Sequence, residues 1–477
     1  MKRLLVILSI GMVMTSIAVC NAEEKEKTED ALTTIVTAPI KVAEGGLQAA
    51  ADVAGGGLQV AADVAGTAVK ALVGIGEGVQ TFFETDILAG TELFVGREAM
   101  DSSGITLGVS LINIYQQNMR GGLSTHNKRG RFMGRHDVEI AFDLERLGIV
   151  EGGGFYVNGE GSYSKTGGID GPSVGSALDV NGKSKSRRSM VISDYWYQQA
   201  LFDGVMQIRL GKLDLTDGFS CGGKAVAFDG SSYAGSNSSR FLNTSFANNP
   251  TIPFKSNGLG LALFYNPNDF WYVAGGMSDA DPRLNSEENG FNTTFHNEDY
   301  FLYVFETGVV PQVDSDKGPM TGAYRFGFWV DGKDKARNSN GRNYRDDMGF
   351  YTSCDQLIRK ENNDPEDSQG LGVFFRFGYA NNDLNDIANF WSGGFQYQGL
   401  IDGRNKDLCG IGVSQALFAD SSSSYTDNDE TVFEVYYNAK VSSNLSLSPT
   451  LQYVMDPGGN DTATDAVVLG LRARMTF

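Results

Sequence analysis

The chain of 477 residues is long enough to enclose a large core or to close a large β-barrel. It has 58 acidic and 39 basic residues and a formal net charge of −19, which argues against nucleic acid as a partner because phosphate backbones bind basic surfaces. The 60 glycines, 29 phenylalanines and 19 tyrosines are typical of many twisted strands joined by tight turns.

Residues 1–22 have the pattern of a secretory signal peptide. Lys2 and Arg3 precede an apolar run, and small residues end it at Ala22. Lipidation of Cys20 is the alternative, but we expect cleavage after Ala22 and export. Without the two basic residues, 58 acids face 37 bases, a net charge of −21. No later run of eighteen apolar residues could form a membrane-spanning helix.

Residues 23–95 form a region with an eleven-residue repeat, which begins at Val42, Val53, Val64 and Ile75. Eleven residues make three helical turns, so these positions would lie along one stripe of a helix. The many glycines weaken this helix, each by roughly 1 kcal/mol relative to alanine. The sequence therefore predicts a marginal amphipathic helical segment. A helix that self-associates or anchors the rest of the protein is the alternative.

Residues 96–477 have a sequence period of two, as in β-strands with one apolar face. The last strand illustrates the pattern: Leu469 and Leu471 alternate with Arg472 and Arg474, and the chain ends on Phe477. Sixteen segments of about the length needed to cross a membrane show this alternation. They are residues 103–115, 134–144, 153–163, 191–200, 204–212, 257–266, 270–278, 299–309, 320–331, 348–359, 370–379, 389–399, 409–418, 432–440, 444–453 and 466–477.

The connections between these segments alternate between short and long. If the last strand ends in the periplasm, the connections on that side are mostly short. Those on the other side include the long stretches 116–133, 164–190 and 213–256. Short turns on one side and long loops on the other are typical of outer-membrane barrels. We therefore predict an all-β, sixteen-stranded antiparallel transmembrane β-barrel, preceded by the N-terminal helical repeat segment.

In such a barrel, the residues between the lipid-facing positions line a water-filled lumen. Mixed charges and aromatic rings on this side could exchange hydrogen bonds with water for those of sugar hydroxyls, or stack on a pyranose ring. The alternative is that the charges only solvate the channel and pair with one another. The candidate pore-lining strand residues are Glu139, Asp143, Glu160, Asp194, Trp196, Arg209, Arg325, Trp329, Arg376, Glu434, Arg472 and Arg474.

The 213–256 loop is the longest connection, and such a loop is either exposed or folded inward as a constriction. We expect inward folding, which makes Asn243 and Ser245 candidate sugar contacts. Arg209 and Arg376 are expected to face water. Charges of both signs argue against strong selection of anions or cations.

Several segments resemble the carbohydrate-selective porins of bacterial outer membranes, the OprB type. The resemblance covers roughly residues 95–477. Its most specific part joins QYVMDPGGN at residues 452–460 to the final GLRARMTF, and other matches include GRHDVEIAFDLERLGI at 134–149 and DYWYQQALFDGVMQIRLGKLDL at 194–215. The resemblance implies a sixteen-stranded outer-membrane barrel that passes sugars by passive diffusion without chemical energy. The repeats lie outside it.

Three other functions compete with a sugar porin: a general non-selective porin, a structural outer-membrane barrel and an enzyme. An enzyme is disfavoured because the only histidines are His126, His136 and His296, and no Gly-x-Ser-x-Gly turn accompanies them. The cysteines after the signal are too far apart for a zinc ribbon, so no metal or cofactor is expected. The expected partners are mono- or oligosaccharides, outer-membrane lipid and, in a homo-oligomer, further copies of the chain.

Overall fold

The computed structural model describes residues 101–477, except 163–166, 183–189, 217–218, 222–223, 227, 236–237, 255–257, 281–299, 365–367, 423–424 and 460. The signal peptide at residues 1–22 and the helical repeat segment at 23–95, both predicted above, lie outside the described residues.

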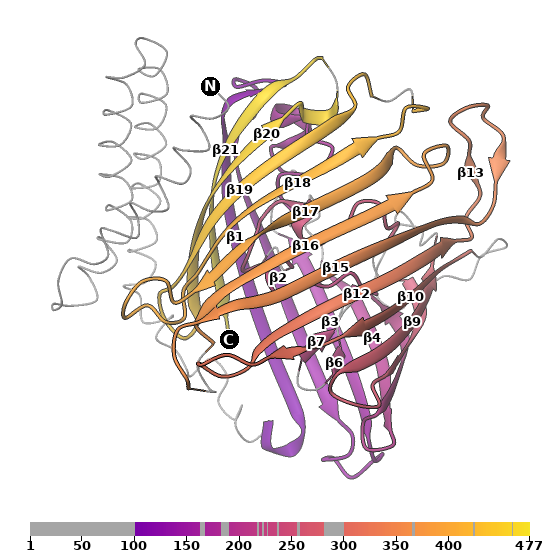
Figure 1. The fold of residues 1–477 in the computed structure, drawn as a ribbon, viewed down its shortest axis with the longest axis vertical. Helices are drawn as coiled ribbons and strands as arrows, with labels where there is room; N and C mark the ends of the chain where they lie inside the picture. Colours follow the sequence, from indigo (N-terminus) through magenta and orange to yellow (C-terminus); the bar gives the residue numbers. More distant parts are fainter. Residues whose placement is uncertain are drawn as a thin grey trace.

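Sixteen strands in the described part of the chain form one closed antiparallel wall (Figure 1). Each strand pairs with the next along the chain, and β1 pairs with β21 to close the barrel. The wall strands are β1 (Ile105–Gly122), β2 (Gly130–Asp143), β3 (Gly153–Ser162), β4 (Val191–Leu201), β5 (Met206–Leu213), β8 (Gly258–Tyr265), β9 (Trp271–Asp279), β10 (Phe301–Val309), β12 (Met320–Asp331), β15 (Asp347–Lys360), β16 (Gly370–Ala380), β17 (Ile387–Gln398), β18 (Leu408–Phe418), β19 (Asp429–Lys440), β20 (Leu445–Met455) and β21 (Thr464–Thr476).

Short elements occupy the connections. They are η2 (Asp170–Val174), β6 (Phe219–Cys221), β7 (Lys224–Val226), α5 (Thr244–Ala247), β11 (Gln312–Val313), β13 (Lys335–Ala336), β14 (Asn343–Tyr344) and η3 (Pro457–Gly459). None of the helices in the described ranges is long and apolar enough to cross a membrane.

The sixteen predicted strands are confirmed, and each overlaps one wall strand. The prediction was wrong for the first connection, which spans residues 123–129 rather than 116–133. β1 and β2 continue to pair through Gln116 with Arg131 and Gln117 with Gly130. The ladder persists there because backbone hydrogen bonds do not require the apolar alternation that marks the lipid-facing part of a strand.

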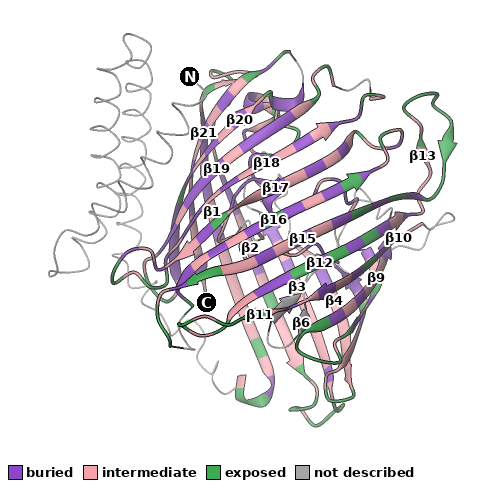
Figure 2. Ribbon diagram, in the orientation of Figure 1, coloured by how far each residue is buried: buried purple, intermediate pink, exposed green. Residues whose placement is uncertain are grey.

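Large apolar side chains on the outer face of the wall are exposed (Figure 2). They include Tyr303, Phe305, Phe326, Phe328 and Phe395. The rings of Phe305 and Phe328 lie directly opposite each other on β10 and β12, with centroids 5.2 Å apart. An apolar face of this extent around a closed barrel matches the hydrocarbon of a membrane.

Candidate pore and constriction

The long connection between β5 and β8, residues 214–257, folds into the barrel. We call it the constriction loop. Its residues reach the far wall, where the peptide N–H of Asp229 donates to Oε2 of Glu306 over 2.8 Å and that of Ser232 donates to Oδ2 of Asp355 over 2.7 Å. Inward folding of this loop, as expected from its length, is therefore observed.

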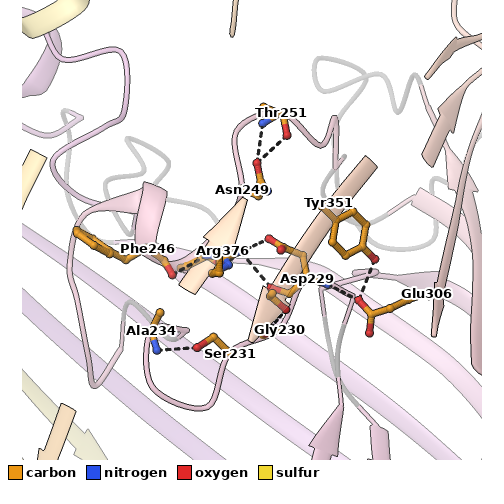
Figure 3. A network of polar contacts seen from close by, with 12 residues as sticks. Asp229, Gly230, Ser231, Ala234, Phe246, Asn249, Thr251, Glu306, Tyr351 and Arg376 are labelled. Carbon is orange, nitrogen blue, oxygen red and sulfur yellow. Dashed lines mark hydrogen bonds and ion pairs between the residues drawn. The ribbon is translucent and has the colours of Figure 1, made fainter. Parts of the chain in front are cut away.

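The first anchor of the constriction loop is the polar network in Figure 3. The carboxylate of Glu306, on β10, accepts hydrogen bonds from the Tyr351 hydroxyl at 2.9 Å and from the peptide N–H of Asp229. It also accepts one from the Tyr272 hydroxyl at 2.6 Å. Arg376, on β16, forms an ion pair with the Asp229 carboxylate and donates to the carbonyl oxygen of Phe246 at 2.8 Å. Two wall charges thus hold both ends of the loop segment between residues 229 and 246.

Burial of the loop aspartate has an electrostatic cost. Burial raises the pKa of the Asp229 carboxyl, although the neighbouring Arg376 guanidinium lowers it in part. Such a pair is stable only when its remaining polar groups are hydrogen-bonded, because two charges have been removed from water. Arg376 meets part of this need by donating to the carbonyl oxygens of Asp229 and Phe246, whereas its Nε is buried without a hydrogen-bond partner among the described residues.

The second anchor lies further along the wall, on β18, β19 and β21. Glu434 accepts hydrogen bonds from the peptide N–H groups of Leu242 at 2.5 Å and Asn243 at 2.8 Å. Arg472 donates to the carbonyl oxygen of Arg240 at 2.7 Å. The Ser245 hydroxyl lies 2.7 Å from the Ser414 hydroxyl. The segment that contains Asn243 and Ser245 was predicted to bind sugar. These contacts turn it toward the wall instead.

Local capping fixes the conformation of this segment. The Asn243 side chain accepts a hydrogen bond from the Ser245 N–H at 3.0 Å and so caps the N-terminus of α5. Phe246 in the same turn stacks on Phe241 with centroids 4.3 Å apart, and both rings are fully buried. The polar groups of Asn243 and Ser245 therefore stabilise the turn and do not point toward a solute.

A second loop also folds inward. It comprises residues 163–190 between β3 and β4, and we call it the second inward loop. The carbonyl oxygen of Val180 accepts hydrogen bonds from Gln116 and Gln452, both at 2.9 Å. Glu430 accepts hydrogen bonds from the peptide N–H groups of Ala177 at 2.7 Å and Leu178 at 3.2 Å.

The sequence prediction treated this second inward loop only as a long connection. The sequence did contain a signal, because the loop has apolar residues that an exposed loop would not need. The structure buries these residues, which are Ile169, Val174, Leu178 and Val180.

The two loops cover the lumen unequally. Inward-facing residues of β8 to β21 are almost all buried in the described part of the wall, among them Tyr272, Arg325, Arg376, Glu434 and Gln452. The inward faces of β2 to β5 keep exposed and half-buried side chains, including Glu139 and Trp196. The accessible side of the lumen therefore runs along β2 to β5.

A stacked group of side chains occupies this accessible side. The Trp196 ring stacks on Tyr156 with centroids 4.8 Å apart, and the guanidinium carbon of Arg209 lies 3.8 Å from the centroid of Trp196. These residues lie on β3, β4 and β5 in neighbouring register. A stacked cation and aromatic rings reinforce one another electrostatically and hold the side chains in one orientation.

Carboxylates lie beside this stack. Arg135 is paired with Asp137 at 2.8 Å and with Glu160 at 2.5 Å. Asp194 accepts a hydrogen bond from the Ser193 hydroxyl at 2.7 Å. The wall thus offers a guanidinium donor and carboxylate acceptors within neighbouring strands, a combination that matches hydroxyl-rich solutes.

The predicted pore-lining residues fall into three groups. Glu139, Asp143, Glu160, Asp194, Trp196 and Arg209 lie on β2 to β5, where Asp143 pairs with Arg146 near the end of β2. Among them, Asp194 and Arg209 are themselves buried. Arg325, Trp329, Arg376, Glu434 and Arg472, with Asn243 and Ser245 of the constriction loop, are buried where loop and wall meet. Arg474 is half-buried near the C-terminus.

The expectation that Arg209 and Arg376 face water was wrong. Their exposed fractions are 7% and 1%. Arg376 is covered by the constriction loop, and Arg209 is packed over Trp196. The period of two correctly assigns side chains to one face of the wall, but it carries no information about which loop covers that face.

No group of histidine, cysteine or acidic side chains within the described residues could hold a metal ion. Cys354 and Cys409 are free thiols.

A closed sixteen-stranded barrel with an apolar exterior, a polar interior and inward-folded loops defines a bacterial outer-membrane porin. The family model for the carbohydrate-selective porin, OprB family, matches residues 128–477, and the chain belongs to this family. It is thus a carbohydrate channel of the bacterial outer membrane, a transport protein rather than an enzyme.

Individual relatives agree with this assignment. Porin B of Pseudomonas aeruginosa is 24% identical over 399 residues, which cover 76% of this chain and 85% of the relative. The putative porin QuiX of Acinetobacter baylyi is 21% identical over 80% of this chain and 91% of the relative. The structure of OprB from Pseudomonas putida at high pH shares the fold, with a TM-score of 0.68 at 18% identity, over 80% of this chain and 96% of that chain.

Proposed function

We propose that sugars diffuse passively along the accessible side of the lumen, past the inward faces of β2 to β5, and that the two inward loops set the size of the passage. The unequal burial of the two halves of the wall carries this proposal. A solute cannot contact Arg376 or Glu434 while the constriction loop covers them, whereas Glu139 and Trp196 are accessible.

The chemistry of the accessible side suits neutral polyols. Glu139 and Glu160 supply acceptors, the half-buried Arg135 supplies donors, and the rings of Tyr156 and Trp196 supply apolar surface for sugar C–H groups. A sugar that displaces water from the wall can form the same hydrogen bonds that the water formed. Entry therefore costs little free energy, and no tight binding delays exit.

Block of the ion current in planar bilayers tests this proposal. Oligosaccharides should reduce the current, and the Trp196→Ala variant should weaken this block several-fold because it removes the central ring of the stack. The matched control is Trp391→Phe, on the far wall, whose side chain bonds Gln415 at 2.8 Å. Equal block of wild type and Trp196→Ala would refute the assigned path.

A general porin without sugar preference is the second candidate, favoured by the mixed charges of Arg135, Asp137 and Glu160. Zwitterions of the same size as the sugars distinguish the two. Block by sugars alone supports a selective channel, and equal block by both solutes supports the general porin.

Two partners complete the proposal. The exposed aromatic exterior contacts outer-membrane lipid. Association of several copies is a prediction that light scattering of the detergent-purified protein would test, with the mass of one chain as the result that contradicts it.

A further inference from the structure

The hairpin that joins β1 to β2 is basic, although the chain as a whole is acidic. No acidic residue occurs between Asp101 and Asp137, although the chain contains 58 acidic residues. The same stretch carries five basic residues, which are Arg120, Lys128, Arg129, Arg131 and Arg135. A strongly acidic protein thus has a hairpin in which all the formal charges are positive.

Two of these cations are used inside the barrel. Arg135 pairs with Asp137 and Glu160. Arg131 donates to the carbonyl oxygens of Gly167 at 2.6 Å and Gly168 at 3.0 Å in the second inward loop. Neither side chain is available to an external ligand.

Lys128 and Arg129 remain at the tip of the hairpin. Both are exposed, and neither side chain forms an ion pair with any other residue that the structure describes. Arg120 is exposed nearby but interacts with another part of the chain, so it only borders the patch. The uncompensated charge is thus centred on Lys128 and Arg129.

The orientation of the hairpin follows from its inner contacts. Ser124 donates its N–H to the carbonyl oxygen of Ser173, and Leu123 donates to that of Val174, so the second inward loop covers the lumen side. On the opposite side, Phe132 is 56% exposed in register with Tyr115. Lys128 therefore lies just beyond a lipid-facing aromatic pair. It is at the opposite end of β1 from the residues that pair with the last residues of β21.

We propose that this patch binds the phosphate groups of an anionic lipid headgroup in the outer leaflet. Aromatic residues mark the membrane interface of outer-membrane barrels, and the phosphates of a lipid lie just above this level. Lys128 and Arg129 supply the charge that phosphates require, and no ion pair with another described residue occupies either side chain. A lipid is the favoured source because the cations adjoin the lipid-facing wall rather than the covered lumen.

Native mass spectrometry of the detergent-purified protein tests the proposal with diphosphorylated lipid A as the probe. The Lys128→Ala/Arg129→Ala variant should bind roughly 30-fold more weakly, about fivefold per cation removed. The matched control, Lys333→Ala/Arg342→Ala, removes two cations from the β13–β14 hairpin, where Asp331, Asp334, Asp346 and Asp347 supply compensating charge, and should leave binding unchanged.

Two further arms use the wild-type protein, so they do not depend on folding of the variant. Dephosphorylated lipid A should bind at least tenfold more weakly than the diphosphorylated form. Inorganic phosphate at an equal phosphate concentration should not displace the lipid. Unchanged binding by the Lys128→Ala/Arg129→Ala variant, equal binding of the dephosphorylated lipid, or full displacement by free phosphate would each overturn the proposal. Sugar block of the current should be the same in all variants.

Discussion

Individual charges on the wall of this barrel are used to hold backbone groups of the loops. Glu434 is fully buried yet faces the peptide N–H groups of Leu242 and Asn243. Arg376 likewise donates to two carbonyl oxygens of the constriction loop. A buried charge is costly without partners, and charge-assisted hydrogen bonds to the backbone offset this cost. Such residues determine where a loop lies without touching the solute.

Replacement of Glu434 tests this role at the level of one residue. Glu434→Ala leaves two buried N–H groups without an acceptor, which costs about 2 kcal/mol and raises the released population of the loop roughly 30-fold. We expect larger and noisier single-channel conductance and a higher size limit for sugars. Glu434→Gln keeps one acceptor and should have a smaller effect. Conductance identical to wild type in both variants would contradict the role.

Gly412 allows the constriction loop to approach β18 closely. A Cβ atom at this position would lie 2.7 Å from the Phe246 ring and 2.9 Å from the Phe241 ring. Because both rings are buried and stacked, Gly412→Val should displace them at a cost of about 1–3 kcal/mol. The measurement is the temperature at which the purified barrel unfolds. Gly275→Val, where no atom lies within 4 Å, is the control and should leave that temperature nearly unchanged.

At the scale of elements, strands and loops differ in how well the sequence predicts them. The strands follow from local alternation, and all sixteen were found. The candidate site was predicted less completely, because burial of Arg376 and Glu434 depends on contacts with residues more than a hundred positions away. No periodic pattern encodes such pairing. The buried apolar residues of the second inward loop, such as Ile169 and Val180, are the one local signal that was overlooked.

The second inward loop should respond to pH through Asp170. Burial, followed by repulsion from Asp179 and Glu430, raises the pKa of the Asp170 carboxyl from 3.8 to about 8. The folded loop therefore binds the proton more tightly than the released loop does. Its packing should be strongest below about pH 4 and should weaken as pH rises toward 8, where Asp170 ionises in place.

Conductance recorded between pH 4 and pH 9 tests whether the second inward loop loosens as pH rises. We expect it to rise over this range as the loop loosens and then to level off above the pKa of Asp170. Asp170→Asn cannot ionise and should flatten this part of the profile. Asp316→Asn, at an exposed position in the turn between β10 and β12, is the control and should retain the wild-type slope. A wild-type slope in Asp170→Asn would assign the effect to another group.

For the whole molecule, the position of the loops decides which charges a passing ion meets. The loops cover the far wall, so the inward charges of β2 to β5 dominate the accessible side. Three bases and five acids leave a net charge of −2 there. These residues are Arg131, Arg135, Arg209, Asp137, Glu139, Asp143, Glu160 and Asp194. The sequence alone suggested no strong selection because it could not separate covered from accessible charges.

This imbalance predicts a weak preference for cations. Under a gradient of potassium chloride, the reversal potential should have the sign of a cation-selective channel. Glu139→Gln removes an exposed charge and should lower the permeability ratio about twofold, because one charge at about 8 Å in water contributes about 0.5 kcal/mol. High salt should reduce the preference through screening.

Asp355→Asn offers a contrast: that carboxylate is buried under the constriction loop beside Arg325, so its removal should change conductance more than ion preference. Anion selectivity in the wild type would show that other charges control the path.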